Sequence, residues 1–253
     1  PSISQIPPMN VLFIAVDDLR PELGCYGHSN IHSPNIDSLA RRGMLFERAY
    51  CQQAVCNPSR SSLMTGMRPD SLGVTGNHLH FRSNHPNVVT LPQHFKQHGY
   101  QSEAIGKIFH GVFPDGSSKT KWDTMGDPAS WSVPAIRFGP RYYYTEDGIA
   151  AAKLAYQQMY KPQNPGADDW TNKLVFGPAT EAPDVADNAL YDGKVADAAV
   201  NRLQQLATTA KPFFLAVGFI KPHSPYIAPK KYFDLYNDVA MPSDIPFPTD
   251  APS

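Results

Sequence analysis

At 253 residues the chain is long enough for one large domain, and no internal repeat or low-complexity segment divides it. Its 22 Lys and Arg residues nearly balance 23 Asp and Glu residues, which argues against the basic field of a nucleic-acid-binding or membrane-surface protein. No apolar run reaches the roughly 18 residues of a membrane span, and no export signal opens the chain. We therefore expect no nucleic-acid partner and no membrane span. Cys25 and Cys51 could pair, but we expect them to be buried thiols.

The first predicted strand covers residues 10–16, a continuous apolar run that is typical of a strand buried on both faces of a parallel sheet. Asp17 and Asp18 follow directly, at the carboxyl end of the strand, where open α/β sheets place their ligands. A bound cation would relieve the repulsion between two adjacent carboxylates. A solvated strand end with an Asp turn explains the same pair, and the residues alone do not separate the two interpretations.

Three short elements are expected next. A helix is predicted for residues 34–42, because Ser33 can cap it and Gly43 can end it. A short strand is predicted for residues 44–50, and a second helix runs from about residue 59 to residue 65.

Cys56 is then expected just ahead of a helix N-terminus, where unpaired N–H groups favour an anion. This position suits an oxyanion nucleophile facing a sulfate or phosphate ester, with Arg60 one turn on. It also suits a thiolate nucleophile of lowered pKa. A thiolate hydrolase needs a histidine base, and none lies in sequence between His32 and His78.

The loop after this helix is rich in polar residues, and a short helix over residues 91–98 follows it. His78, His80 and Arg82 could line a pocket for an anionic sugar. A solvated polar loop explains these three side chains equally well.

A more polar strand is predicted for residues 100–105, and it delivers Lys107 and His110. Lysine offers a fixed cation and histidine a group that transfers protons near neutral pH. A surface loop would also accommodate both.

The stretch 111–187 is rich in Pro, Gly and aromatic residues, and we expect it to be an insertion above the sheet that contributes substrate specificity. One helix is expected within it, over residues 146–160. An amphipathic helix is predicted for residues 192–207, whose apolar face is formed by Ala196, Ala199, Val200, Leu203 and Ala207.

A second buried strand covers residues 213–220 and delivers Lys221 and His223. Each of these three predicted strands is therefore followed by polar side chains at its carboxyl end. Parallel strands end at one edge of a sheet, so we expect these groups to converge there with Cys56.

The segment Cys56-Asn57-Pro58-Ser59-Arg60, followed by Thr65-Gly66, resembles the first signature of the type I, formylglycine-dependent sulfatases. Residues 99–107 resemble the second signature. Six segments resemble the iduronate-2-sulfatase branch in particular: residues 16–21, 33–37, 53–56, 106–110, 213–218 and 221–223. The resemblance implies the alkaline-phosphatase-like α/β fold, a mixed, mostly parallel sheet flanked by helices.

The resemblance further implies that a formylglycine-generating enzyme oxidises Cys56 to formylglycine. One hydroxyl of the hydrated aldehyde attacks the sulfur of a sulfate ester, and the other expels sulfate from the covalent sulfo-enzyme intermediate. Asp17 and Asp18, with an oxygen of modified Cys56, bind Ca2+. The remaining implied roles are that Arg60 holds the formylglycine, Lys107 and His223 bind the sulfate, His110 orients the nucleophile or relays its proton, and His223 or a later lysine protonates the leaving oxygen.

The implied substrate is a sulfated carbohydrate, either a 2-O-sulfated uronic acid of a glycosaminoglycan or a sulfated algal polysaccharide. The implied compartment is secreted, periplasmic or lysosomal. The family's further metal-binding pair and second lysine have no counterpart after His223. We therefore expect residues 1–253 to be the incomplete N-terminal part of a catalytic domain, completed by a C-terminal part of the same protein.

Two other functions fit the same fold. One is a phosphatase, phosphodiesterase or phosphonate hydrolase, most of which use Thr or Ser as the nucleophile. The other is a non-catalytic carbohydrate-binding pseudoenzyme, which would keep an intact thiol at Cys56 and bind no calcium.

Overall fold

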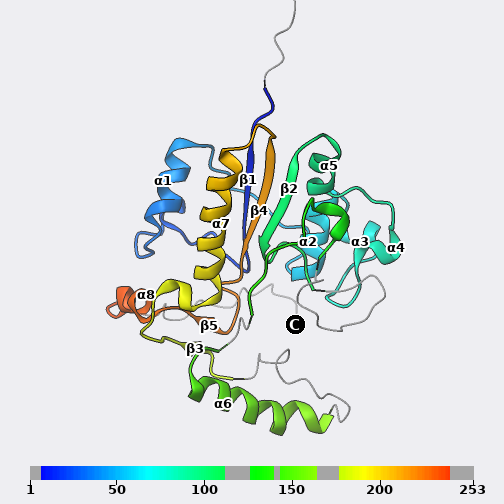
Figure 1. Cartoon of the computed structure of the whole chain (residues 1–253). Coiled ribbons are helices and arrows are strands. Elements are labelled where there is room, and N and C mark those ends of the chain that lie inside the picture. Colours follow the sequence, from blue (N-terminus) through cyan, green and yellow to red (C-terminus); the bar gives the residue numbers. More distant parts are fainter. Residues whose placement is uncertain (1–6, 112–125, 140–142, 164–176, 240–253) are drawn as a thin grey trace, which may run out of the picture.

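The computed structural model describes residues 7–111, 126–139, 143–163 and 177–239 (Figure 1). Its centre is a parallel sheet of strand order β1-β4-β2. The strands of this sheet are β1 (Val11–Val16), β2 (Gln101–Gly106) and β4 (Phe213–Phe219). A small second sheet pairs β3 (Thr180–Glu181) with β5 (Tyr226–Ile227). The parallel sheet with helices on both faces confirms the expected α/β class.

The helices lie between these strands in the chain. The α-helices are α1 (Pro34–Arg42), α2 (Cys56–Thr65), α3 (Pro69–Leu72), α4 (Phe81–Asn84), α5 (Leu91–Gln97), α6 (Glu146–Ala155), α7 (Tyr191–Ala207) and α8 (Lys230–Phe233). Shorter helical turns are η1 (Gly24–Tyr26), η3 (Pro128–Ser130), the π-helical η4 (Tyr156–Tyr160), η5 (Lys161–Gln163), η7 (Asp187–Ala189) and η8 (Asp234–Tyr236). Within the described residues, no helix is both long and apolar enough to cross a membrane.

Strand β4 is central and is buried on both faces, as its apolar sequence predicts. Side chains alternate along a strand. Phe213, Leu215 and Val217 therefore pack against α7 on one face of the sheet. Phe214 and Ala216 belong to the core on the opposite face, which also contains side chains of α2 and α5.

The predicted apolar face of α7 was only partly right. Ala199 is buried, but Val200 is 54% exposed. The buried stripe instead contains Val195 and Leu206, so the helix is rotated by about one position from the predicted orientation.

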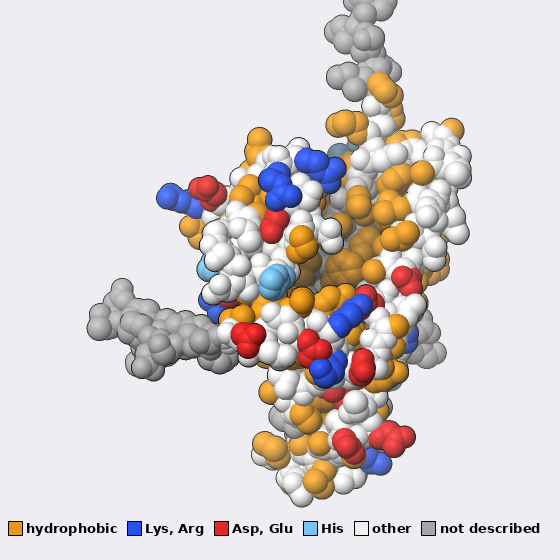
Figure 2. Space-filling model, turned by 90° about the vertical axis from the view of Figure 1, so that its left-hand side faces the viewer, with side chains coloured by type: hydrophobic (Ala, Val, Ile, Leu, Met, Phe, Trp, Pro, Cys, Tyr) orange, Lys and Arg blue, Asp and Glu red, His pale blue; other side chains and the backbone are white. Residues whose placement is uncertain are grey.

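Strand β1 lies at the edge of the sheet that the described residues form, and the prediction that it is buried on both faces was wrong. Leu12 and Ile14 are 44% and 51% exposed. They pair in register with Leu215 and Val217 and therefore point to the face that α7 covers. However, α7 packs over β4 and β2. Seen from the side of α1, the molecule shows a hollow lined with hydrophobic side chains (Figure 2).

The other edge of the sheet is covered by part of the expected insertion. Ser132 N donates to Ser102 O at 2.7 Å, and Ile136 N donates to Ala104 O at 2.9 Å. Residues 131–136 thus run beside β2, whereas the prediction placed them above the sheet. Residues 112–125, 140–142 and 164–176 of the insertion lie outside the described part of the chain, whereas α6 lies beyond the carboxyl end of the sheet (Figure 1).

Residues 44–50 form no strand, contrary to prediction, and Met44 and Tyr50 are 79% and 82% exposed. Their apolar side chains had suggested a strand, but no strand among the described residues pairs with them. Cys51 is exposed and Cys25 is half-buried, and both are free thiols. The expectation of two buried thiols therefore fails at Cys51.

Candidate active site

The two carboxylates after β1 occupy different environments. Asp17 N donates to Phe219 O at 3.1 Å and so extends the pairing of β1 with β4 by one residue. Asp18 has a φ of 57°, a left-handed conformation that Asp tolerates better than most residues. The backbone therefore turns between them, leaving Asp17 buried and the Asp18 side chain 52% exposed.

Asp17 is held by two buried cations. Its Oδ1 lies 2.7 Å from Arg60 Nη2, and its Oδ2 contacts Lys107 Nζ. Burial alone would raise the pKa of Asp17, but the charges and hydrogen bonds of Lys107 and Arg60 outweigh it and hold this pKa below its ordinary value. Asp17 is therefore a carboxylate at neutral pH.

Arg60 joins the ends of two strands. Its Nη1 donates to Lys107 O and to Ile108 O, both at 2.8 Å, beyond the end of β2, while Nη2 binds Asp17 beyond β1. For Lys107, burial together with the charge of Arg60 outweighs the attraction of Asp17, so the pKa of Lys107 is lowered.

Cys56 is the first residue of α2, so this helix begins about three residues earlier than predicted. Its Sγ lies 4.0 Å from Asp18 Oδ1 and 3.9 Å from Lys107 Nζ. Burial raises the pKa of the Cys56 thiol, and Asp17 and Asp18 raise it further. The sequence had suggested a lowered pKa at the helix N-terminus, and that expectation is wrong because burial and the nearby carboxylates prevail. The arrangement does not favour a thiolate nucleophile.

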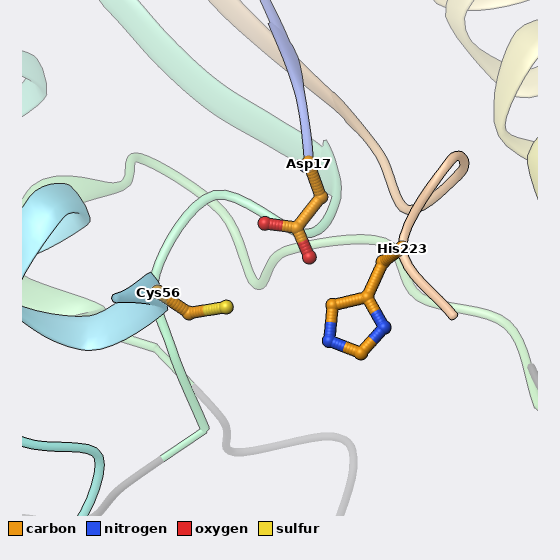
Figure 3. Close-up of side chains that lie close together, drawn as sticks. All are labelled: Asp17, Cys56 and His223. Atoms are coloured by element: carbon orange, nitrogen blue, oxygen red, sulfur yellow. The ribbon is translucent and has the colours of Figure 1, made fainter. Parts of the chain in front are cut away.

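His223 faces the same space from the turn after β4. Its Nδ1 lies 2.6 Å from Ser224 O. A carbonyl oxygen only accepts hydrogen bonds, so Nδ1 carries a proton. Nε2 lies 4.0 Å from Asp18 Oδ2. Ligand atoms of Asp17, Cys56 and His223 all lie within 4.8 Å of one another, and their side chains point into one space (Figure 3).

The structure thus brings together Asp17, Asp18, Cys56, Lys107 and His223, with Arg60 behind them. Their convergence at the carboxyl ends of β1, β2 and β4 was predicted. His110 also follows β2 and is half-buried; its assigned role remains a prediction.

Asn57 is a site residue that sequence reasoning missed. It is buried, and its Nδ2 donates to Gly76 O at 3.0 Å and to Leu79 O at 2.7 Å. Its own N–H donates to Asn77 Oδ1 at 3.0 Å. Asn57 therefore fixes the loop 76–79 against the start of α2. Its position directly after Cys56 was the only signal in the sequence.

The three residues that were predicted to line a pocket for an anionic sugar have different environments in the structure. His80 is 3% exposed, and its Nδ1 accepts a hydrogen bond from Arg82 N at 3.1 Å. The Arg82 guanidinium is bound by both oxygens of Asp127, at 2.5 and 2.6 Å, and by Gln93. These contacts give His80 and Arg82 structural positions and argue against a role in a sugar pocket. His78 is exposed, and its role remains a prediction.

Comparison with known proteins gives the family. Residues 9–244 match the family model described as Sulfatase. The chain is 40% identical to human (Homo sapiens) iduronate 2-sulfatase over 228 residues, which cover 90% of this chain. The chain belongs to the sulfatase family.

Two further similarities to this sulfatase chain are informative. An ulvan-active sulfatase of Formosa agariphila is 38% identical over 151 residues, covering 59% of this chain and 28% of the relative. The crystal structure of Ps i-CgsB in complex with k-i-k-neocarrahexaose has a TM-score of 0.64 at 21% identity, covering 92% of this chain and 49% of that one. The second likeness supports the fold alone.

The chain spans 38% of the length of human iduronate 2-sulfatase. It includes the sulfatase signature at Cys56 and the strand ends that meet there.

Proposed function

We propose that the protein hydrolyses sulfate esters of a sulfated saccharide, and that residues 1–253 form the N-terminal part of its catalytic domain. The observation that carries this proposal is that Cys56, within its Cys-x-Pro-Ser-Arg segment, lies with Asp17 and His223 in a cluster whose ligand atoms are within 4.8 Å of one another. The 40% identity to iduronate 2-sulfatase supports a sulfuric ester hydrolase.

Cys56 is proposed to be the precursor of formylglycine, made by a formylglycine-generating enzyme. A thiol whose pKa is raised by burial is a weak nucleophile at neutral pH. The hydrated aldehyde supplies a hydroxyl nucleophile at this position instead. The N-terminus of α2 and the cation of Lys107 favour negative charge there.

Lys107 and His223 are proposed to bind the sulfate group. Lys107 Nζ lies 3.9 Å from Cys56 Sγ, within reach of a sulfate oxygen placed beside the nucleophile. His223 has Nδ1 engaged by Ser224 O, so Nε2 is the nitrogen that faces the site. When protonated, Nε2 can donate to the leaving oxygen. His110 is proposed to orient the nucleophile or to relay its proton.

The oxygen ligands at the carboxyl end of β1 suit a hard cation. We assign Asp17, Asp18 and an oxygen of modified Cys56 as ligands of Ca2+. Carboxylate oxygens are preferred calcium ligands. The Asp18 carboxylate is 52% exposed and faces Cys56, so it is available to a cation. The oxygens of Asp17 also contact Arg60 and Lys107, so a bound ion would share them. The ion would supply fixed positive charge for the developing negative charge of the transition state.

Two carboxylates supply fewer than the roughly six to eight oxygens that calcium takes. We propose that a C-terminal part of the protein supplies further ligands. The outer edge of β1 supports this proposal, because no strand among the described residues pairs with it and its Leu12 and Ile14 side chains are exposed. An edge of this kind is suited to a further strand.

We propose a 2-O-sulfated uronic acid of a glycosaminoglycan as substrate, on the identity to iduronate 2-sulfatase. A sulfated algal polysaccharide is the second candidate, and the 38% identity to an ulvan-active sulfatase favours it. We propose a secreted, periplasmic or lysosomal compartment, on the similarity to iduronate 2-sulfatase.

The test uses the full-length protein made together with a formylglycine-generating enzyme. Mass spectrometry of the peptide that contains Cys56 should show an aldehyde in place of the thiol. A 2-O-sulfated uronic acid disaccharide, an ulvan oligosaccharide, a phosphate monoester and a phosphonate monoester are then compared as substrates. Cys51→Ser is the control and should keep full activity, whereas Cys56→Ala should abolish it.

Three results would contradict the proposal. An unmodified Cys56 in active enzyme would overturn the mechanism. Faster hydrolysis of the phosphate or phosphonate ester would favour the phosphatase or phosphonate hydrolase alternative. Saccharide binding without turnover, with an intact thiol, would indicate a pseudoenzyme.

A further inference from the structure

We propose that Asp192 is a positioning residue for His223, acting through the backbone of the turn after β4. This turn, residues 220–225, begins directly after Phe219, the last residue of the strand. The Asp192 carboxylate accepts a hydrogen bond from Ile220 N, at 2.9 Å from Oδ1 and 3.1 Å from Oδ2. It also accepts one from Lys221 N at 2.8 Å. The first two N–H groups of the turn are therefore fixed by one side chain.

Asp192 is itself fixed relative to the sheet. It is the second residue of α7, and the buried Val195 and Ala199 of this helix pack in one core cluster with Leu215 and Val217 of β4. The next residue, Gly193, has no room for a side chain, because a Cβ there would lie 1.9 Å from Asp187 O. The first turn of α7 thus lies directly against η7, and this contact holds the Asp192 carboxylate beside the end of β4.

Lys221 holds the far side of the same turn. Its Nζ donates to His223 O at 3.0 Å and also to Pro225 O. His223 N donates to Ile220 O at 2.9 Å and closes the turn. The sequence predicted that Lys221 would converge with Cys56, but in the structure its ammonium binds carbonyl groups of the turn.

The orientation of the imidazole depends on these backbone contacts. Nδ1 lies 2.6 Å from Ser224 O, an atom of the same turn, and Nε2 is then directed toward Asp18 Oδ2 at 4.0 Å. A rotation of the turn would therefore move Nε2 out of the cluster with Asp17 and Cys56. Asp192 prevents that rotation at the point where the turn leaves the strand.

A carboxylate that only stabilised the fold would have a different signature from a positioning residue. Its removal would lower stability and leave the ring of His223 in place in molecules that remain folded. A positioning residue acts through His223, so its removal should matter little once His223 is gone. The catalytic part of this inference rests on the proposed function of His223, whereas the effect on the ring does not.

The first measurement needs no activity. The Cε1–H resonance of His223, identified by its loss in His223→Gln, is recorded in the full-length protein and in Asp192→Ala and Asp192→Asn. We expect a displaced resonance in Asp192→Ala and a smaller displacement in Asp192→Asn, which keeps one acceptor oxygen. The matched control is Asp197→Asn, on the same helix, whose exposed carboxylate accepts a hydrogen bond from Asn188 Nδ2 at 3.1 Å. It should leave the resonance unchanged.

The second measurement is a double-mutant cycle on sulfate-ester hydrolysis. Asp192→Ala should lower kcat/KM about 100-fold in the wild-type background, but by no more than about twofold in the His223→Gln background. An unchanged His223 resonance in folded Asp192→Ala, or losses that multiply in the double variant, would overturn the inference. If Asp192→Ala does not fold, Asp192→Asn carries both comparisons. If the protein hydrolyses no sulfate ester, the proposed function fails and the resonance alone decides the positioning role.

Discussion

Replacing Gly218 by Ala is expected to damage both stability and activity, because β2 and β4 touch beside the candidate active site. A Cβ at Gly218 would lie 1.9 Å from Lys107 O and 2.3 Å from its carbonyl carbon. A Cβ at Gly106, where φ is +80°, would lie 2.1 Å from Gly218 O. These obstructing atoms belong to the backbone, so no side-chain rotation relieves the clash.

The size of the effect follows from these distances. To reach an ordinary contact near 3.4 Å, the Lys107 carbonyl would have to retreat by about 1.5 Å. That carbonyl accepts the 2.8 Å hydrogen bond from Arg60, and the Lys107 ammonium contacts Asp17. Overpacking costs about 1–3 kcal/mol, whereas Ala in place of Gly stabilises by about 0.4–1 kcal/mol through the unfolded chain. The net loss is about 1–2 kcal/mol, and misplacing the site by about 1 Å lowers the rate about 100-fold.

Urea unfolding, followed by the fluorescence of buried tryptophan, measures the stability, and initial rates on a sulfated substrate measure the activity. Gly76→Ala is the matched control, because a Cβ there meets nothing within 4 Å and no left-handed φ is required. It should change stability by no more than about 0.5 kcal/mol. A Gly218→Ala variant with the wild-type unfolding midpoint and rate would refute the reasoning.

Three further predictions concern buried charges. Asp17→Asn should cost about 3–5 kcal/mol in urea unfolding, because its two buried cationic partners lose their counter-charge. Asp18→Asn, at a half-exposed position, should cost no more than about 0.5 kcal/mol, and equal losses would contradict this. Burial lowers the pKa of His80 in the folded protein below 6.5. The neutral ring therefore makes its full contribution to the free energy of unfolding above pH 6.5, and this contribution is lost as pH falls through the pKa of the folded protein. The melting temperature of wild type should therefore fall more steeply below pH 6.5 than that of His80→Asn; parallel profiles would refute this. Arg82→Met should cost about 3–5 kcal/mol by leaving Asp127 buried and unpaired, with an unchanged KM for the sulfated substrate. A raised KM at wild-type stability would contradict this and would indicate that Arg82 contacts the substrate.

The convergence of the site could be predicted because it depends on local patterns and one topological rule. Two apolar runs and one more polar strand are followed by Asp17, Lys221 and Lys107, and parallel strands bring their carboxyl ends to one edge of a sheet. The context of Cys56, with Pro58 and Arg60, predicted a nucleophile at this position without any knowledge of the contacts.

The environment of each side chain could not be predicted in the same way. The apolar sequence of β1 is the same whether a strand lies beside it or not, so the exposure of Leu12 and Ile14 depends on neighbours that the pattern does not specify. The pKa of Cys56 depends on burial, on the charge of Arg60 in its own helix, and on charges from two other segments. Arg82 is equally suited to an anionic sugar or to Asp127, and only the fold decides between them.

The central position of β4 also determines when the sheet can form. Val11 of β1 pairs with Phe214, about 200 residues later in the chain, and Gln101 of β2 pairs with Phe213. Neither early strand can complete its hydrogen bonds until β4 has left the ribosome. Contacts between such distant residues form slowly, and an apolar strand that waits for its partner is prone to aggregate. In a newly made chain, β1 therefore stays without its β4 partner until nearly the whole sequence to Phe219 has been synthesised.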